Sequence, residues 1–201
     1  MARSGGARAR LFVAVDLPVA VRERLAAWAR EAAAGLQLGS VPFPLRLLDR
    51  DLLHLTLCFL GGRPLAEIAA IGSALNACTV QVGELSVGPP LWLPPARPRS
   101  LGVAIHDDQG TLADLHATVR NVLSEAISWR PERRRFRAHV TLARTRGRAA
   151  AGWNLPGAGA PLPATPQLRF AAESLTLYRS WLAPQGASYE ALASCDLSAW
   201  R

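Results

Sequence analysis

The sequence repeats one order of elements, and this internal repeat limits the possible folds more than any other feature. Each copy has an apolar strand-like segment, a stretch with apolar residues at helical spacing, and a second strand-like segment. The first copy spans residues 11–60 and the second spans residues 101–143. A duplication of this kind predicts two similar α/β lobes related by a pseudo-two-fold axis, with matched segments facing each other.

Hydrophobic periodicity and turn residues set the limits of the predicted elements. The predicted strands are 11–15, 52–60, 80–87, 101–105, 136–143, 167–177 and 189–197, and the predicted helices are 19–34, 65–77 and 112–127. A Gly/Pro/Ala-rich loop is predicted at 149–166. We expect residues 1–9 to be a disordered tail and residues 10–201 to form a single bilobal domain.

Each copy carries the motif His-x-Thr in its second strand, at His54 and Thr56 and again at His139 and Thr141. Side chains two residues apart in a strand share a face, so the His and Thr of each motif point away from the intervening apolar residue. That apolar face would pack on a helix. The two His and two Thr are therefore expected to line the space between the lobes.

Two imidazoles and two hydroxyls make an acid/base site that needs no metal. One imidazole can take a proton from water while the other gives a proton to a leaving oxygen, because an unperturbed His titrates near pH 6.5 and can hold either form. The Thr hydroxyls can donate hydrogen bonds to non-bridging phosphate oxygens without adding charge. The near-symmetric sequence does not distinguish the proton donor from the proton acceptor.

Three further positions need their own interpretation. His116 and Thr118 form a third His-x-Thr, but the surrounding apolar pattern is helical, so His116 is interpreted as a helix-surface residue. Phe59 and Arg144 each lie five residues after a motif His. In a regular strand this odd spacing places them on the face opposite the motif His and Thr, so they reach the motif face only if the strand ends or bulges there. We interpret Phe59 as a core residue, and Arg144 as a candidate to clamp a phosphate or stack on a base.

The composition excludes several chemistries. All 23 basic residues are Arg and none is Lys, which removes P-loop and Schiff-base chemistry. The three Cys show neither a C-x-x-C pair nor zinc-ligand spacing, so no disulfide framework and no structural metal are expected. The formal charge of +8 favours a polyanionic partner. Seven Arg flank the second motif, either as a solvated run or as a surface for a nucleic-acid backbone, and they are Arg130, Arg133, Arg134, Arg135, Arg137, Arg146 and Arg148.

Four ordered segments resemble the 2H phosphoesterases, specifically the bacterial and archaeal RNA 2',3'-cyclic phosphodiesterases once named 2'-5' RNA ligases. They are Arg10-Leu-Phe-Val-Ala-Val-Asp-Leu-Pro18, His54-Leu-Thr-Leu-Cys-Phe-Leu-Gly61, Phe136-Arg-Ala-His-Val-Thr-Leu-Ala-Arg144 and Leu175-Thr-Leu-Tyr-Arg-Ser-Trp-Leu182. The resemblance implies an α+β fold with two pseudo-symmetric α/β lobes, mostly antiparallel sheets and a central groove that holds both motifs. It also implies hydrolysis of a terminal 2',3'-cyclic phosphate to a 2'-phosphomonoester without metal.

The same resemblance implies a role for each matched residue. His54 would be the general acid that protonates the departing 3' oxygen, and His139 would be the general base that activates water. Thr56 and Thr141 would hold the phosphate. Arg144 would contact the phosphate or the terminal base, and no cofactor would be needed.

Two other functions remain open. The same site could join a cyclic phosphate to a 5'-hydroxyl as a 2'-5' RNA ligase, because microscopic reversibility lets both His swap roles. A non-catalytic RNA-binding module would not require two titratable imidazoles.

The expected partner is RNA with 2',3'-cyclic phosphate ends. The apolar run at 11–15 is too short for a signal peptide or a membrane span, so we expect a cytoplasmic monomer that does not bind membranes.

Overall fold

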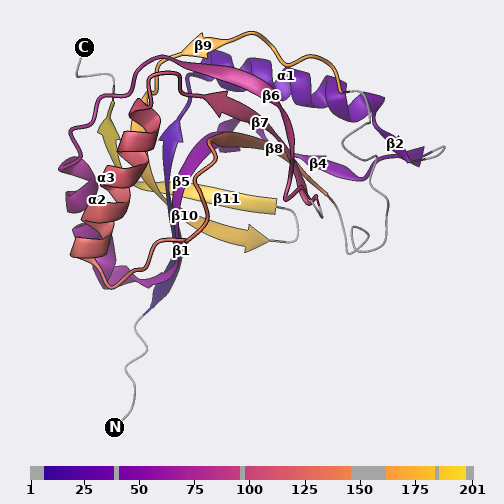
Figure 1. Ribbon diagram of the computed structural model, residues 1–201. Helices are drawn as coiled ribbons and strands as arrows, with labels where there is room; N and C mark the ends of the chain where they lie inside the picture. The colour runs from indigo at the N-terminus through magenta and orange to yellow at the C-terminus, as the bar shows by residue number, and fades with distance from the viewer. Residues whose placement is uncertain (1–6, 39–40, 96–97, 146–161, 184–185, 198–201) are drawn as a thin grey trace.

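The computed structural model describes residues 7–38, 41–95, 98–145, 162–183 and 186–197, and it confirms the predicted α+β class (Figure 1). The helices are α1 (Val19–Gly35), α2 (Ile68–Asn76) and α3 (Thr111–Ala126), with 3-10 turns η1 (Arg50–Leu52) and η2 (Leu65–Glu67). The strands are β1 (Arg8–Asp16), β2 (Gln37–Leu38), β3 (Val41–Pro42), β4 (Leu45–Leu47), β5 (His54–Pro64), β6 (Leu85–Leu93), β7 (Ser100–His106), β8 (His139–Thr145), β9 (Arg169–Phe170), β10 (Ser174–Ala183) and β11 (Gly186–Asp196).

Nine of these strands form one open sheet in the order β11-β10-β1-β5-β8-β7-β6-β9, with β4 also paired to β8. The order is symmetric about its centre, because β1 lies beside β5 in one copy as β7 lies beside β8 in the other. The two central strands meet at one antiparallel pair, Leu55 and Val140. The two lobes are thus halves of one sheet, joined at the strands that carry the motifs.

The helix of each copy packs on the motif strand of the other copy. α1 follows β1 in the chain but contacts β8, and α3 follows β7 but contacts β5. α2 lies against α3 and also contacts β10 and β11, and Figure 1 shows α2 and α3 side by side at the left of the view, with α1 along the top. The buried side chains of both lobes form one continuous core. No helix in the described ranges is both long and apolar enough to cross a membrane.

The first strand begins earlier than predicted. Arg8 and Ala9 belong to β1, so the prediction of a disordered tail over 1–9 is wrong for these two residues, while residues 1–6 lie outside the described ranges. The reason is the length of β5, which continues to Pro64 and pairs with β1 along its whole length. The Arg8 side chain also donates a hydrogen bond to the Gly62 carbonyl.

The predicted strands at 80–87 and 167–177 are wrong in their limits. The first begins only at Leu85, and the second is divided between β9 and β10. β6 continues through Pro89 and Pro90, which lack the N–H that a regular ladder needs. The β6–β7 register shifts at this point, as expected where proline occurs within a sheet.

Candidate active site

The two His-x-Thr motifs lie side by side at the centre of the sheet. β5 and β8 are antiparallel and pair at Leu55 and Val140, which are the middle residues of the two motifs. This register places each motif His opposite the Thr of the other motif. Leu55 and Val140 are both fully buried, so the four polar side chains share the opposite face.

The same backbone contact holds both imidazoles. His54 Nδ1 lies 2.8 Å from the Leu52 carbonyl oxygen, and His139 Nδ1 lies 2.7 Å from the Arg137 carbonyl oxygen. A carbonyl oxygen only accepts, so Nδ1 carries the hydrogen in both rings. Nε2 is therefore the reactive atom of each ring, and in His54 it lies 3.0 Å from Thr56 Oγ1.

A bulge in each motif strand turns a later side chain onto the motif face. The register of β5 against β1 shifts after Thr56, and that of β8 against β7 shifts after Thr141. Two consecutive buried residues follow in each strand, and Phe59 and Arg144 come next and are exposed. Both side chains therefore reach the motif face. The interpretation of Phe59 as a core residue is wrong, since 52% of its surface is exposed.

The motif face lines a groove with a volume of about 730 Å³. The residues predicted from the sequence all line it, and they are His54, Thr56, His139, Thr141 and Arg144. Two more arginines, Arg10 of β1 and Arg46 of β4, also line it, and Arg46 is the direct cross-strand partner of Arg144. Within the described ranges none of these three arginines forms an ion pair. Imidazoles, hydroxyls and unpaired guanidinium groups together suit a phosphate-bearing ligand.

Other predicted features lie elsewhere. His116 of α3 is half-buried and stacks on Phe136 at a centroid distance of 4.1 Å, so the third His-x-Thr does not line the groove. The exposed arginines of the segment before β8 are Arg130, Arg133, Arg134, Arg135 and Arg137, whereas Arg146 and Arg148 lie outside the described residues. Among the residues that the structure describes, no His, Cys, Asp or Glu side chains form a group of three that could hold a metal ion.

Comparison with known proteins finds a curated relative and solved structures with the same fold. No family model matches the sequence. An RNA 2',3'-cyclic phosphodiesterase from Aeropyrum pernix is 29% identical over 105 residues, which are 52% of this chain and 59% of that protein. Escherichia coli LigT complexed with 3'-AMP matches with a TM-score of 0.75 and 24% identity, over 96% of this chain and 99% of LigT. The protein TT0787 of Thermus thermophilus matches with a TM-score of 0.67 and 27% identity, over 96% of this chain and all of that one (100%).

In addition to these matches, the structure has two symmetric motif strands that line one groove. The chain shares its fold with LigT and with TT0787. The matched segment of the Aeropyrum pernix protein is little more than half of that protein, at 59% of its length. Further solved structures with this fold include a phosphoesterase, at a TM-score of 0.69 and 23% identity over 94% of this chain and 98% of that one.

The two imidazoles of the site have unequal surroundings. Phe12 stacks on His54 at a centroid distance of 4.9 Å, and Tyr189 meets it edge-on at 5.3 Å. His139 has no aromatic ring contact within the described part of the chain. Burial lowers the pKa of His54 to about 4, and the Leu52 carbonyl and the charge of Asp16 act in the opposite direction.

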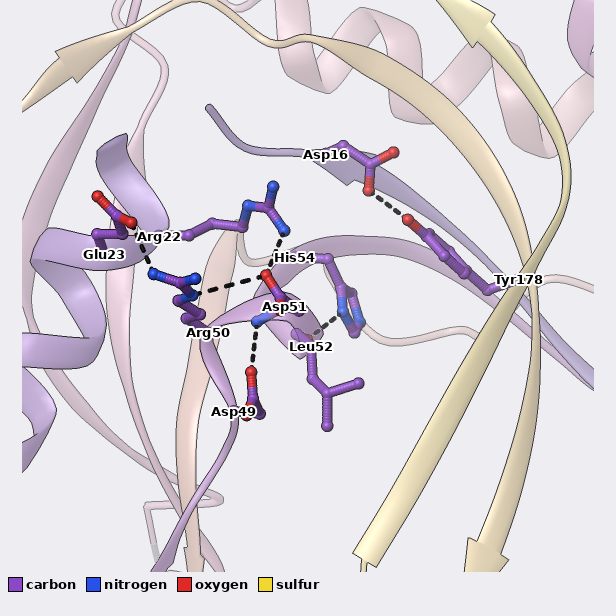
Figure 2. A network of polar contacts seen from close by, with 9 residues as sticks. All are labelled: Asp16, Arg22, Glu23, Asp49, Arg50, Asp51, Leu52, His54 and Tyr178. Carbon is purple, nitrogen blue, oxygen red and sulfur yellow. Dashed lines mark hydrogen bonds and ion pairs between the residues drawn. The ribbon is translucent and has the colours of Figure 1, made fainter. Parts of the chain in front are cut away.

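A second, smaller cavity lies on another side of His54. Its volume is about 190 Å³, and its lining includes Asp16, Arg22, Asp51 and Tyr178. Figure 2 shows the Asp16 carboxylate directed at the Tyr178 hydroxyl above the His54 ring, with Arg22 reaching Asp51 on the other side. None of these four residues was assigned to the site from the sequence. A signal was present in the polar residues at 174, 176 and 178, whose spacing of two places them on one strand face.

Proposed function

We propose that the protein is an RNA 2',3'-cyclic phosphodiesterase that converts a terminal cyclic phosphate into a 2'-phosphomonoester. One observation carries the proposal: both motif imidazoles present Nε2 to the same groove while a backbone carbonyl fixes Nδ1. General acid/base catalysis of a phosphodiester requires two such groups, one to take a proton and one to give one.

In the proposed reaction His139 Nε2 takes a proton from a water molecule as the water oxygen attacks phosphorus. The bond between phosphorus and the 3' oxygen breaks, and this oxygen takes the proton of His54 Nε2. The product carries the phosphate on its 2' oxygen and a free 3'-hydroxyl. Proton exchange with solvent then returns both imidazoles to their starting forms.

The remaining groove residues would bind the phosphate. Thr56 and Thr141 can donate hydrogen bonds to its non-bridging oxygens, and such preorganised donors stabilise charge that grows in the transition state. Arg46 and Arg144 lie directly opposite each other, an arrangement of like charges that is unfavourable until an anion binds between them. We propose that these two guanidinium groups bind the RNA backbone or its terminal phosphate.

The test uses purified protein, EDTA and an RNA that ends in a 2',3'-cyclic phosphate. The expected product is the 2'-phosphate, formed at an unchanged rate in EDTA. His54→Ala and His139→Ala should each lose at least about 100-fold in rate, the low end for removal of a general acid or base. His116→Ala is the matched control and should retain activity, because His116 belongs to the third His-x-Thr outside the groove.

Other results would point to the alternatives. A 2'-5' linked product in the presence of an RNA with a 5'-hydroxyl would indicate a ligase. RNA binding with no turnover would indicate a binding module. Inhibition by EDTA would contradict the metal-free mechanism, and full activity in both His variants would contradict the assignment of the site.

A further inference from the structure

The motif strands are nearly symmetric, but the residues beside the two imidazoles differ in charge. Asp16, the last residue of β1, is the cross-strand partner of His54. The corresponding partner of His139 in β7 is Ala104, which carries no charge. Glu132 also lines the groove, but it is exposed and forms no ion pair with His139 among the described residues. Solvent therefore screens its charge more than that of a half-buried carboxylate.

Three hydroxyl groups of one strand fix the Asp16 carboxylate in place. Ser174 Oγ donates to Oδ2 at 2.7 Å, Thr176 Oγ1 donates to Oδ2 at 2.6 Å, and Tyr178 Oη donates to Oδ1 at 2.7 Å. Ser194 of β11 then lies 2.8 Å from Thr176 Oγ1, so it can donate in turn. Hydrogen bonds to an ionised acceptor are among the strong ones, and these hold a negative charge beside His54.

The same carboxylate positions the aromatic wall that covers His54. Burial and the bond to Asp16 raise the pKa of Tyr178, so its hydroxyl remains a hydrogen-bond donor. The Tyr178 ring stacks on Phe12 at 5.2 Å, and Phe12 in turn stacks on His54 at 4.9 Å. Asp16 thus fixes Tyr178, Tyr178 fixes Phe12, and Phe12 fixes the plane of the imidazole.

We infer that Asp16 is a positioning residue that prepares His54 as the proton donor and so sets the direction of proton flow through a nearly symmetric site. This inference rests on the proposed phosphodiesterase function. A carboxylate stabilises an imidazolium ion, and only the His54 side of the site has such a carboxylate as cross-strand partner, since the partner of His139 is Ala104. Asp16 transfers no proton itself.

Burial disfavours the protonated form of His54, so a proton donor at this position needs a nearby negative charge that stabilises the imidazolium. The pKa of about 4 means that the imidazole is neutral in the free protein near pH 7. The anionic phosphate of the substrate and the charge of Asp16 both favour the imidazolium when substrate binds. Within the described residues, several titratable and charged groups face His54 from the elements packed around it. They are Asp16 of β1, Arg22 of α1, Asp51 of η1, His139 and Arg144 of β8, Glu173 before β10, Tyr178 of β10 and Tyr189 of β11.

Two substrates separate a donor-specific role from a structural one. The first is a 2',3'-cyclic nucleotide, and the second is the same nucleotide with sulfur as the bridging 3' atom, which leaves as a thiolate with little need for a proton. Asp16→Asn should lower kcat on the oxygen substrate by about 3- to 10-fold. Without the carboxylate the pKa of the His54 imidazolium falls by about one unit, so less of the donor is protonated, and this loss is partly offset because an imidazolium of lower pKa is a stronger acid. The rate on the sulfur substrate should be nearly unchanged. The high-pH limb of the kcat profile should also move to lower pH.

Two further variants complete the experiment. Asp108→Asn removes an exposed carboxylate that lines neither cavity, so it should match the wild type on both substrates. Asp16→Glu keeps the negative charge, so its ratio of the two rates should stay within about threefold of the wild-type ratio. This variant also carries the test if Asp16→Asn does not fold.

The outcomes distinguish the two proposals. Equal losses on both substrates in Asp16→Asn, or a tenfold change in the ratio for Asp16→Glu, would overturn the role of Asp16 while leaving the phosphodiesterase function intact. A wild-type protein that hydrolyses neither substrate would overturn the proposed function and this inference with it.

Discussion

At the scale of single residues, the half-buried imidazole of His54 links the site to the stability of the fold. Burial lowers its pKa from 6.5 to about 4. Between pH 6.5 and about pH 4, His54 binds a proton in the unfolded chain but stays neutral in the folded protein. The free energy of unfolding therefore falls as the pH falls through this range. We expect His54→Gln to lose less stability than the wild type between pH 7 and pH 4.5, by about 1–3 kcal/mol.

Urea unfolding at the two pH values measures this difference. The exposed His106 gives the matched control, since His106→Gln should follow the wild-type pH dependence. A His54→Gln variant that loses as much stability on acidification as the wild type would show that the imidazole is not buried as described.

Some residues around the groove could be predicted from the sequence, and others could not. His54, Thr56, His139 and Thr141 were predictable, because a local spacing of two in two matched strands places them on one face. Asp16 was not, because the partners that give it a role lie more than 150 residues away, as the separation of 162 residues from Tyr178 illustrates. A contact between strands so distant in the chain depends on sheet order, which local periodicity does not report.

At the scale of elements, the two motif strands were predicted to within a few residues of their ends, but the positions of their bulges were not. Apolar alternation predicted β5 and β8, but a bulge changes the face of every later residue, and nothing in the alternation marks where it occurs. Phe59 was for this reason assigned to the core although it lines the groove. Arg144 also lines the groove, and it was predicted there because its chemistry suits a phosphate, not because of its position in the alternation.

The bulge in the second lobe depends on a glycine, which gives a prediction for β7. A Cβ atom at Gly102 would lie 2.5 Å from the Val140 carbonyl oxygen, which is backbone and cannot move aside without displacing β8. We expect Gly102→Ala to destabilise the protein by about 1–3 kcal/mol, the usual range for overpacking. The proposed phosphodiesterase activity should fall as well, because Thr141 is the cross-strand partner of Gly102.

Calorimetric melting and the rate on a cyclic nucleotide would measure both effects. Gly35→Ala at the end of α1 is the control, since a Cβ atom there would meet nothing within 4 Å. Equal melting temperatures for Gly102→Ala and the wild type would contradict the close approach of β7 to β8.

At the scale of the whole molecule, part of the positive charge behind the formal value of +8 lies where a polyanion would bind. Arg10, Arg46 and Arg144 line the groove without ion pairs among the described residues. Elsewhere on the sheet an arginine such as Arg169 is paired, here with Glu84 at 2.8 Å. The absence of Lys is compatible with this arrangement, because the planar guanidinium suits phosphate recognition and the proposed reaction needs no amine nucleophile.

This charge distribution predicts that KM for an oligonucleotide with a cyclic phosphate end rises with salt, and more steeply than KM for a cyclic mononucleotide. Each contact between an arginine and a phosphate of a single strand contributes roughly 0.7 to the slope of log KM against log salt concentration. Arg46→Gln should therefore lower the slope for the oligonucleotide by roughly 0.7, and Arg169→Gln, at the far edge of the sheet, should leave it unchanged. Steady-state kinetics between 50 and 300 mM salt, roughly the range over which phosphate contacts weaken, measure these slopes. A slope near zero for the wild type would mean that the groove binds only the terminal nucleotide, and that the rest of the RNA leaves the protein without touching Arg46.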